Sequence, residues 1–370
     1  MARRRKDGKK ATAYFDYNLL FILIFLLCFG LVMLYSSSSY TSANLYDDSA
    51  HYLKLQFRNI LVGVIPMYFF ARIDYHFWKK FGFFAYFCSF ALCVLVMFPI
   101  PGLTRSSHGQ SRWLNLGPLS FQPSEFAKVA VILFLAWQIE RTKKATRGFG
   151  FMCRTILPLL PIIGLVGSNN LSTAIIILGI GGILIFVSNP GYLEFIGLGS
   201  AGAGFIAVFL AAESYRLERL AIWRNPEKYE KGFQTIQGLY AIGSGGIFGK
   251  GFGNSLQKLG FVPEAQNDMI FSIICEELGL VGASFVLLLF LILIWRFFVI
   301  ASHAPDLEGA LIASGAMAHM MIQVILNIAV VTNTIPNTGI TLPFISYGGT
   351  SVMFLLFEMG LVLNVSSLVK

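Results

Sequence analysis

The chain has 370 residues, of which 56% are apolar and only 13% are charged. Soluble domains carry about a quarter charged residues, so this composition excludes a soluble or fibrous protein and indicates a polytopic, all-α integral membrane protein. The formal net charge is +9. We attribute the excess of Lys and Arg to cytoplasmic loops, so nucleic acid is not expected as a partner.

The N-terminal end of the chain predicts a membrane orientation. Residues 1–17 are strongly basic, and an uncharged run follows from Tyr17 to Tyr46. This run is longer than the apolar core of a signal peptide and lacks a small-residue cleavage site. We therefore expect a cytoplasmic N-terminus followed by one transmembrane domain, residues 18–370.

Ten transmembrane helices are expected along the chain, because a span needs roughly 20 mostly apolar residues. Ser168-Asn169-Asn170 and Asn189-Pro190-Gly191 supply the turns that divide the longest uncharged run. The ten ranges are approximately 18–37, 57–73, 81–100, 123–139, 154–168, 171–188, 192–212, 267–297, 308–332 and 343–367.

The charges between these spans agree with the expected orientation. Basic residues cluster at 72–80 and 139–154, which a cytoplasmic N-terminus places inside. The longest hydrophilic stretch, about 213–266, then forms a large extracytoplasmic loop between helices 7 and 8. Its cations either act there or are only offset by neighbouring Glu residues.

Two further features are assigned no chemistry. The five Cys residues lie in or beside apolar runs without a CxxC pair, so neither a disulfide framework nor a zinc site is indicated. The glycine-rich stretch 243–253 resembles a phosphate loop, but no Walker or GxGxxG register fits. We expect it to form a tight turn close to a helix end.

The loop before the fourth span contains a candidate polar site. Glu125 and Lys128 are three residues apart on one helix face. They form either an internal ion pair or the wall of a polar cavity. Arg112 and Trp113 combine a fixed cation with an amphipathic ring, which suits a lipid-linked phosphate or sugar, although an interfacial anchor would look the same.

The eighth span brings three carboxylates close together in the sequence. Asp268 lies at its outer start, where it meets either an extracytoplasmic substrate or only caps the helix. Glu276 and Glu277 lie about two turns deeper, and Glu277 points away from Asp268. We interpret these two as structural charges, and we expect Lys128 to pair with Glu277, with Glu276 or Glu125 as the alternatives.

Irregular backbone is expected between the last two spans. Residues 334–351 contain two Pro residues and the Gly348-Gly349 pair inside an apolar zone. Such backbone is tolerated at membrane depth only where protein or water satisfies it. The segment therefore presents Ser346 and Tyr347 to a cavity, or these residues only pack.

Several of these motifs together resemble the SEDS family, the shape, elongation, division and sporulation proteins FtsW, RodA and SpoVE. The matching strings are RWLNLG with FQPSEFAK, YRLERL with NPEKY, GSGG with FGKGFGNS, PEAQNDMIF with EELGLVG, and TLPFISYGG. They cover roughly residues 15–366 in the family's order. The C-terminal LNVSS, the short N-terminus and PEAQND are closer to FtsW or SpoVE than to RodA.

The resemblance implies a multi-pass protein of the bacterial cytoplasmic membrane that polymerises lipid II into glycan strands at the outer face. Its implied partners are a class B penicillin-binding protein and other divisome or elongasome membrane proteins. Asp268 is the implied catalytic base for an inverting displacement. The candidates for substrate binding are Arg112, Trp113, Gln122, Ser124, Glu125, Lys128, Arg216, Arg219, Ser346 and Tyr347.

Cations or a metal ion are needed by this chemistry, because the leaving group is a pyrophosphate. Arg112, Arg216 and Arg219 have the best expected topology, and a divalent cation such as Mg²⁺ or Mn²⁺ is an alternative. The chain departs from the family where Gln266-Asn267 replace His-Thr and Asn170 replaces an acid. The competing functions are a lipid II translocase and a non-catalytic scaffold of a cell-wall synthase.

Overall fold

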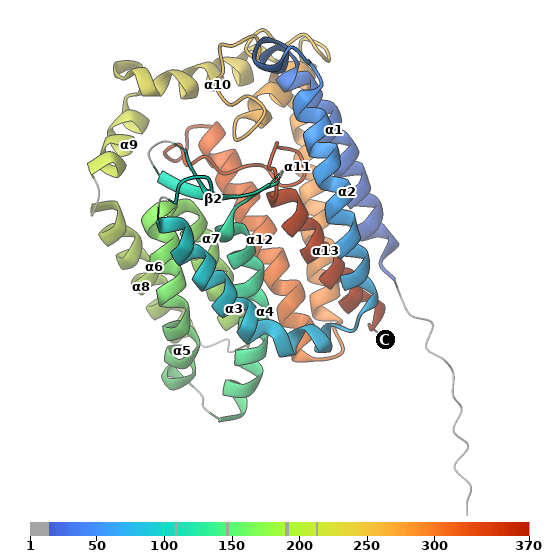
Figure 1. The fold of residues 1–370 in the computed structure, drawn as a ribbon, viewed down its shortest axis with the longest axis vertical. Coiled ribbons are helices and arrows are strands. Elements are labelled where there is room, and N and C mark those ends of the chain that lie inside the picture. The colour runs from blue at the N-terminus through green and yellow to red at the C-terminus, as the bar shows by residue number, and fades with distance from the viewer. Residues whose placement is uncertain are drawn as a thin grey trace, which may run out of the picture.

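The computed structural model describes residues 15–98, 100–107, 110–117, 119–145, 148–188, 192–211 and 214–369. Most of the predicted basic N-terminal segment therefore lies outside the described residues. The described chain is predominantly a bundle of helices that run roughly parallel to one long axis (Figure 1). A small sheet and two short helices cover one end of this bundle.

Each expected span coincides with helical structure. The corresponding elements are α1 (Tyr17–Tyr46), α2 (His51–Arg72), α3 (Tyr75–Met97), α4 (Pro123–Ala145), α5 (Phe149–Ile156) with η1 (Leu157–Leu159) and α6 (Leu160–Asn169), α7 (Leu171–Ser188), α8 (Tyr192–Ala211), α11 (Ile270–Ser302), α12 (Leu307–Val331) and α13 (Ser351–Ser367). By length and composition, six helices within the described ranges are apolar enough to cross a membrane. They are Tyr17–Tyr46, Lys80–Met97, Gly150–Asn169, Leu171–Ser188, Ile270–Ser302 and Leu307–Val331.

Two loops of the prediction contain regular structure. Between α3 and α4 the chain forms an antiparallel sheet in the order β1 (Thr104–Ser107), β2 (Gln110–Leu116), β3 (Leu119–Phe121). The stretch 213–266 contains α9 (Ser214–Arg224), η2 (Pro226–Lys228), η3 (Glu230–Gly232) and α10 (Phe233–Ser244). Both lie toward the upper end in Figure 1, opposite the α2–α3 turn and the C-terminal end of α4, where the predicted cytoplasmic charges begin.

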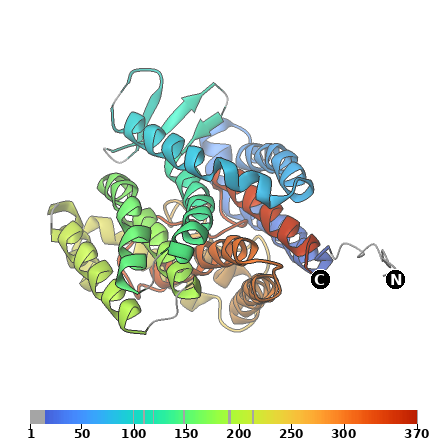
Figure 2. The same ribbon diagram turned by 90° about the horizontal axis from the view of Figure 1, so that it is seen from below.

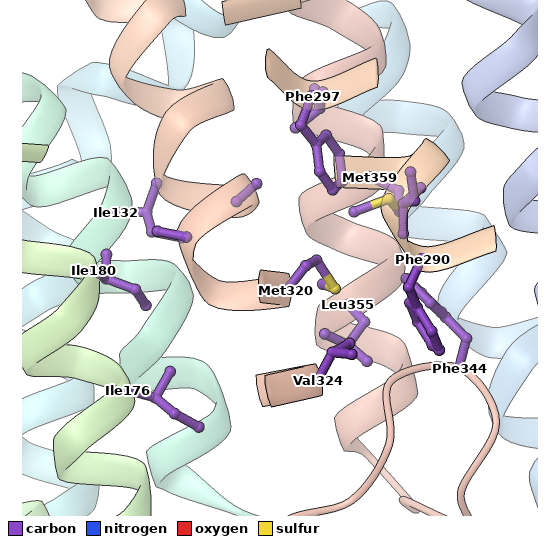
Figure 3. Packing of buried hydrophobic residues seen from close by; sticks show 14 of the residues in the cluster. Ile132, Ile176, Ile180, Phe290, Phe297, Met320, Val324, Phe344, Leu355 and Met359 are labelled. Atoms are coloured by element: carbon purple, nitrogen blue, oxygen red, sulfur yellow. The ribbon is translucent and has the colours of Figure 1, made fainter. Parts of the chain in front are cut away.

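Helix α12 occupies the centre of the bundle. It contacts α4, α7, α11 and α13, and the view along the bundle shows these helices grouped around it (Figure 2). Apolar side chains fill the space between them (Figure 3). Those labelled there are Ile132, Ile176, Ile180, Phe290, Phe297, Met320, Val324, Phe344, Leu355 and Met359, all within one buried cluster.

Helix α11 is kinked at Gly279, whose φ of 66° is in the left-handed region. The kink frees backbone groups that a helix would normally pair. The glycine-rich segment pairs them instead, since Leu280 N donates to Gly246 O and Lys250 N donates to Glu276 O, each at 2.9 Å. The predicted turn near a helix end is therefore confirmed, since it directly follows Ser244, the last residue of its own helix, and it packs against the kink of α11.

Candidate functional site

One cavity collects polar side chains from distant parts of the chain. Its volume is about 450 Å³, and it lies where β2, the start of α4, the segment before α11 and the segment before α13 meet. Its wall includes seven residues singled out from the sequence: Arg112, Trp113, Gln122, Glu125, Lys128, Asp268 and Tyr347. The fold thus joins the motif before the fourth span to the motif before the eighth.

The other candidates for substrate binding lie elsewhere. Ser124 lines a small adjoining hollow of about 20 Å³ with Arg112 and Gln122. Ser346 Oγ accepts from Leu342 N at 2.8 Å, so it closes a turn and is absent from the cavity wall. Arg219 is exposed and donates to Asn337 O at 3.2 Å. The side chain of Arg216 lies outside the described part of the structure.

A buried ion pair forms one wall of the cavity. Lys128 Nζ lies 2.8 Å from Glu125 Oε1, and both side chains are almost fully buried. Ser351 Oγ donates to Glu125 Oε2 at 2.6 Å, which links the first turns of α4 and α13. The internal pair and the cavity wall, which the sequence left as alternatives, are the same feature. A charge placed here can meet an anionic ligand without further desolvation.

Asp268 lies in the cavity two residues before α11 begins and is 6% exposed. Gln234 of α10 donates from Nε2 to Asp268 Oδ1 at 3.5 Å. The pKa of Asp268 is raised to about 7, mainly by burial and also by the Glu264 carboxylate, while Arg219 opposes this rise. A carboxyl group with this pKa is suited to accept a proton near neutral pH.

The two deeper carboxylates of α11 have partners of their own. Glu277 Oε1 lies 2.7 Å from Lys258 Nζ and also accepts from Ser36 Oγ of α1 at 2.7 Å. Glu276 Oε1 lies 2.6 Å from Lys250 Nζ. The predicted pairing of Lys128 with Glu277 is therefore wrong, because residues 245–258 fold back onto α11 and bring Lys258 to Glu277.

Positions that depart from the SEDS pattern remain close to the cavity. Asn170 lines it, and its Oδ1 accepts from Thr173 N at 3.2 Å, which caps the start of α7. Asn267 also lines the cavity. Gln266 contributes its backbone, since Gln266 O accepts from Tyr347 N at 2.8 Å. The amide at position 170 therefore performs the capping that an acid could also perform.

Tyr347 is held in place by backbone hydrogen bonds and by packing of its ring. Its backbone bonds the segment before α11, and Gln56 of α2 donates from Nε2 to Ser346 O at 3.2 Å. The Tyr347 ring packs edge to face with Tyr52, with centroids 5.0 Å apart. The irregular segment before α13 is thereby fixed to both α2 and α11.

Several polar residues of this region were missed by sequence reasoning. Gln234 contacts Asp268 from α10, and Gln323 contacts Lys128 from α12 at 3.1 Å. Asn327 bonds the backbone of Asp268 at 2.8 Å. A signal for the last two was present, because His319, Gln323 and Asn327 recur every four residues in an otherwise apolar helix.

A metal ion would find few ligands in this cavity. Within the described residues, no three His, Cys, Asp or Glu side chains come close enough to hold a metal ion. Asp268 and Glu264 are the carboxylates that line the cavity besides the lysine-paired Glu125. Mg²⁺ is commonly bound by one or two carboxylates together with substrate phosphates, so this pair fits a cation shared with a phosphorylated substrate.

Comparison with known proteins identifies the family. The profile of the FtsW/RodA/SpoVE proteins, described as "Cell cycle protein", matches residues 17–370. The chain belongs to the SEDS family. Stage V sporulation protein E of Bacillus subtilis is 40% identical to this SEDS protein over 356 residues, which cover 95% of this chain and 96% of that protein.

Other SEDS relatives match over similar lengths. The "Probable peptidoglycan glycosyltransferase FtsW" of Trichlorobacter lovleyi is 36% identical over 97% of this chain and 94% of its own. A chain of a peptidoglycan synthase complex, solved to show how polymerization and crosslinking are coordinated, superposes with a TM-score of 0.80 at 26% identity, covering 95% of this chain and 97% of its own.

Rod shape determining protein RodA of Thermus thermophilus is a further solved SEDS structure that matches. It superposes with a TM-score of 0.70 at 26% identity, covering 95% of this chain and 96% of its own. The predicted SEDS resemblance is confirmed, and the two curated relatives are SpoVE and FtsW proteins, in line with the subgroup interpretation.

Proposed function

We propose that this protein is a peptidoglycan glycosyltransferase that polymerises lipid II into glycan strands at the outer face of the bacterial cytoplasmic membrane. The observation that carries the proposal is the meeting of Asp268 and Lys128 in one cavity. A carboxylate that accepts a proton and a cation that meets a departing phosphate are the two groups that this reaction needs. The FtsW relatives carry the same activity in their names.

In the proposed reaction, Asp268 accepts the proton of the acceptor's 4-hydroxyl group. The hydroxyl oxygen attacks the anomeric carbon of the α-linked donor, and the bond from that carbon to the pyrophosphate oxygen breaks as the β-1,4 bond forms. One displacement inverts the anomeric carbon, so a single carboxylate suffices. The electron pair of the broken bond leaves with the undecaprenyl pyrophosphate.

The leaving pyrophosphate is stabilised by the cations of the cavity. Lys128 Nζ already donates to Glu125 and Gln323, and its third N–H can bond a phosphate oxygen. Arg112 lines the same cavity and offers a guanidinium fork. A divalent cation, if bound by Asp268 and Glu264, would supply further positive charge to the phosphates.

The proposed membrane arrangement has ten transmembrane helices with a cytoplasmic N-terminus. The large loop 213–266 then lies outside with the cavity, where lipid II can enter from the outer leaflet. Proposed partners are a class B penicillin-binding protein transpeptidase and other divisome or elongasome proteins. The similarity to a chain of a peptidoglycan synthase complex supports such a partnership.

Polymerisation of lipid II by the purified full-length protein tests this function, alone and with its transpeptidase. We expect glycan strands from the wild type and none from Asp268→Asn, because the amide cannot accept the proton. Glu227→Gln, which removes an exposed carboxylate from the same loop, is the matched control and retains activity. Absence of strands from the wild-type complex, with lipid moved across vesicles instead, would establish a translocase.

A further inference from the structure

A stripe of three polar residues runs along α12. His319, Gln323 and Asn327 are spaced by four residues, so they share one helix face. All three are at most 2% exposed in a helix that is otherwise mainly apolar. Buried polar groups in membrane-spanning helices are costly and face partners or wet cavities, and each member of the stripe has such a partner.

The outer end of the stripe holds the candidate base. Asn327 Nδ2 donates to Asp268 O at 2.8 Å and to Ile340 O at 2.7 Å. The first bond fixes the backbone that carries the Asp268 carboxylate. The second fixes the segment of Gly339, Ile340 and Thr341, which lines the same cavity. Asn327 therefore joins two walls of the cavity to the central helix.

The middle of the stripe holds the candidate cation. Gln323 Nε2 donates to Thr341 O at 3.0 Å, and a carbonyl oxygen can only accept. The amide is thus oriented with Oε1 toward Lys128, which donates to it at 3.1 Å. The ammonium group that α4 carries is thus held in place by a side chain of α12.

The inner end of the stripe orients the middle. His319 Nε2 lies 2.8 Å from Gln323 Oε1, so this nitrogen must carry the hydrogen. Nδ1 lies 2.9 Å from both carboxylate oxygens of Glu358 in α13. Glu358 thereby holds the imidazole ring so that Nε2 remains a donor toward Gln323 Oε1.

We propose that the α12 stripe of His319, Gln323 and Asn327 is the positioning element of the site, setting the separation of Asp268 and Lys128. Gln323 and Asn327 are four residues apart, which is a rise of about 6 Å along one rigid helix. A displacement needs its base and its leaving-group cation on opposite sides of the reacting carbon, so this separation must not drift. The inference rests on the proposed glycosyltransferase function and assigns its geometry to residues that act through Asp268 and Lys128.

Steady-state lipid II polymerisation by full-length variants tests the stripe. Asn327→Leu frees Asp268, so kcat is expected to fall about tenfold or more with KM little changed. Gln323→Leu and His319→Leu leave the Lys128 ammonium group misplaced, so KM is expected to rise about tenfold. Glu358→Gln, which keeps a donor toward Nδ1, is expected to retain most of the affinity that Glu358→Leu loses.

Asn364→Leu is the matched control in α13. Asn364 also bonds two backbone groups, accepting from Tyr75 N at 2.8 Å and donating to Ala71 O at 3.0 Å, at the other end of the bundle. It is expected to lower the thermal midpoint as much as Asn327→Leu while leaving kcat and KM unchanged. If Asn327→Leu does not fold, Asn327→Ser, which is too short to span both carbonyls, replaces it.

The outcomes separate this inference from the function on which it rests. A wild-type protein that makes no strands contradicts the glycosyltransferase function itself. An active wild type whose Asn327 and Asn364 variants lose kcat equally would overturn the inference, since the stripe would then only stabilise the fold. Unchanged KM in both Gln323→Leu and His319→Leu would equally remove the assignment to Lys128.

Discussion

The Asp268 carboxyl group is harder to ionise in the folded protein than in water. Burial is the main cause, and its pKa of about 7 reflects a cavity wall in which Gln234 is a distant donor. Ionisation is needed for a base but is unfavourable for stability, because a charge is then held in a desolvated site. The activity and the stability of the protein should therefore respond to pH in opposite directions.

We expect kcat/KM for lipid II to rise with pH through about 7, the pKa at which Asp268 becomes the carboxylate. Because the folded pKa exceeds the unfolded value, the wild type loses stability as pH rises through this range. Asp268→Asn cannot ionise, so its thermal midpoint at pH 8 should equal or exceed that of the wild type. A lower midpoint for Asp268→Asn would make Asp268 a structural cap.

Buried ion pairs at Glu125 and Glu277 should behave as separate units. Removing one partner of a buried pair typically costs about 3 to 5 kcal/mol, so Lys128→Ala, Lys258→Ala and Glu277→Ala should each lower the unfolding midpoint. Lys258→Ala/Glu277→Ala should cost clearly less than the sum of its singles. Lys128→Ala/Glu277→Ala should be additive, because these residues bond different partners.

The sequence predicted on which helix face each charged residue lies, but it did not predict the long-range partner of Glu277. Helical spacing predicted that Glu277 points away from Asp268 and that Glu125 lies near Lys128. It could not assign Lys258 to Glu277, because that pair depends on how residues 245–258 wrap back onto α11. Long-range partners are set by loop paths, which local periodicity does not encode.

The elements of the fold followed the apolar runs closely, and differences occur where backbone is irregular. Helix α13 begins at Ser351 rather than 343, since Pro343 and the Gly348-Gly349 pair interrupt the helix. The fifth expected span is divided by a 3-10 turn that contains Pro158. The sheet at 104–121 was not predicted, because its strands are short and lack regular alternation of polar and apolar residues.

The glycine-rich segment should no longer pack against the kink of α11 when a side chain is added at Gly249. A Cβ there would lie 2.1 Å from Glu277 O, so the segment must move away from the α11 kink. Gly249→Ala should lower the thermal midpoint and activity together. Gly253→Ala is the matched control, because Gly253 has a similar positive φ but no atom within 4 Å of the added Cβ. Equal losses in both variants would mean that backbone strain alone is responsible.

At the scale of the whole molecule, the two ends of the bundle differ in the way the sequence predicted. The sheet and α10 lie at one end, and the α2–α3 turn and α5 lie at the other (Figure 1). That the RWLNLG and QND motifs meet in one cavity could not be predicted from the sequence, because Trp113 and Asp268 are 155 positions apart along the chain.

Single cysteines in a variant without the five native Cys residues should reveal the orientation. A cysteine replacing Lys231, which is exposed, should react with a membrane-impermeant thiol reagent in intact cells without an outer membrane. A cysteine replacing Lys144 should react only after the cells are opened. The reverse pattern would place Asp268 on the cytoplasmic side and contradict an outer-face reaction.

We expect the bilayer boundary to fall near the Gly279 kink of α11. From Phe271 to Glu277 every residue of α11 is buried, whereas Leu280 and Val281 are 63% and 54% exposed. The 23 residues from Leu280 to Ser302 are about 34 Å long, which matches a hydrocarbon core of about 30 Å. We therefore expect Asp268 to lie outside the hydrocarbon core, on the side where the pyrophosphate of a polyprenyl lipid would meet it while the lipid tail stays in the bilayer.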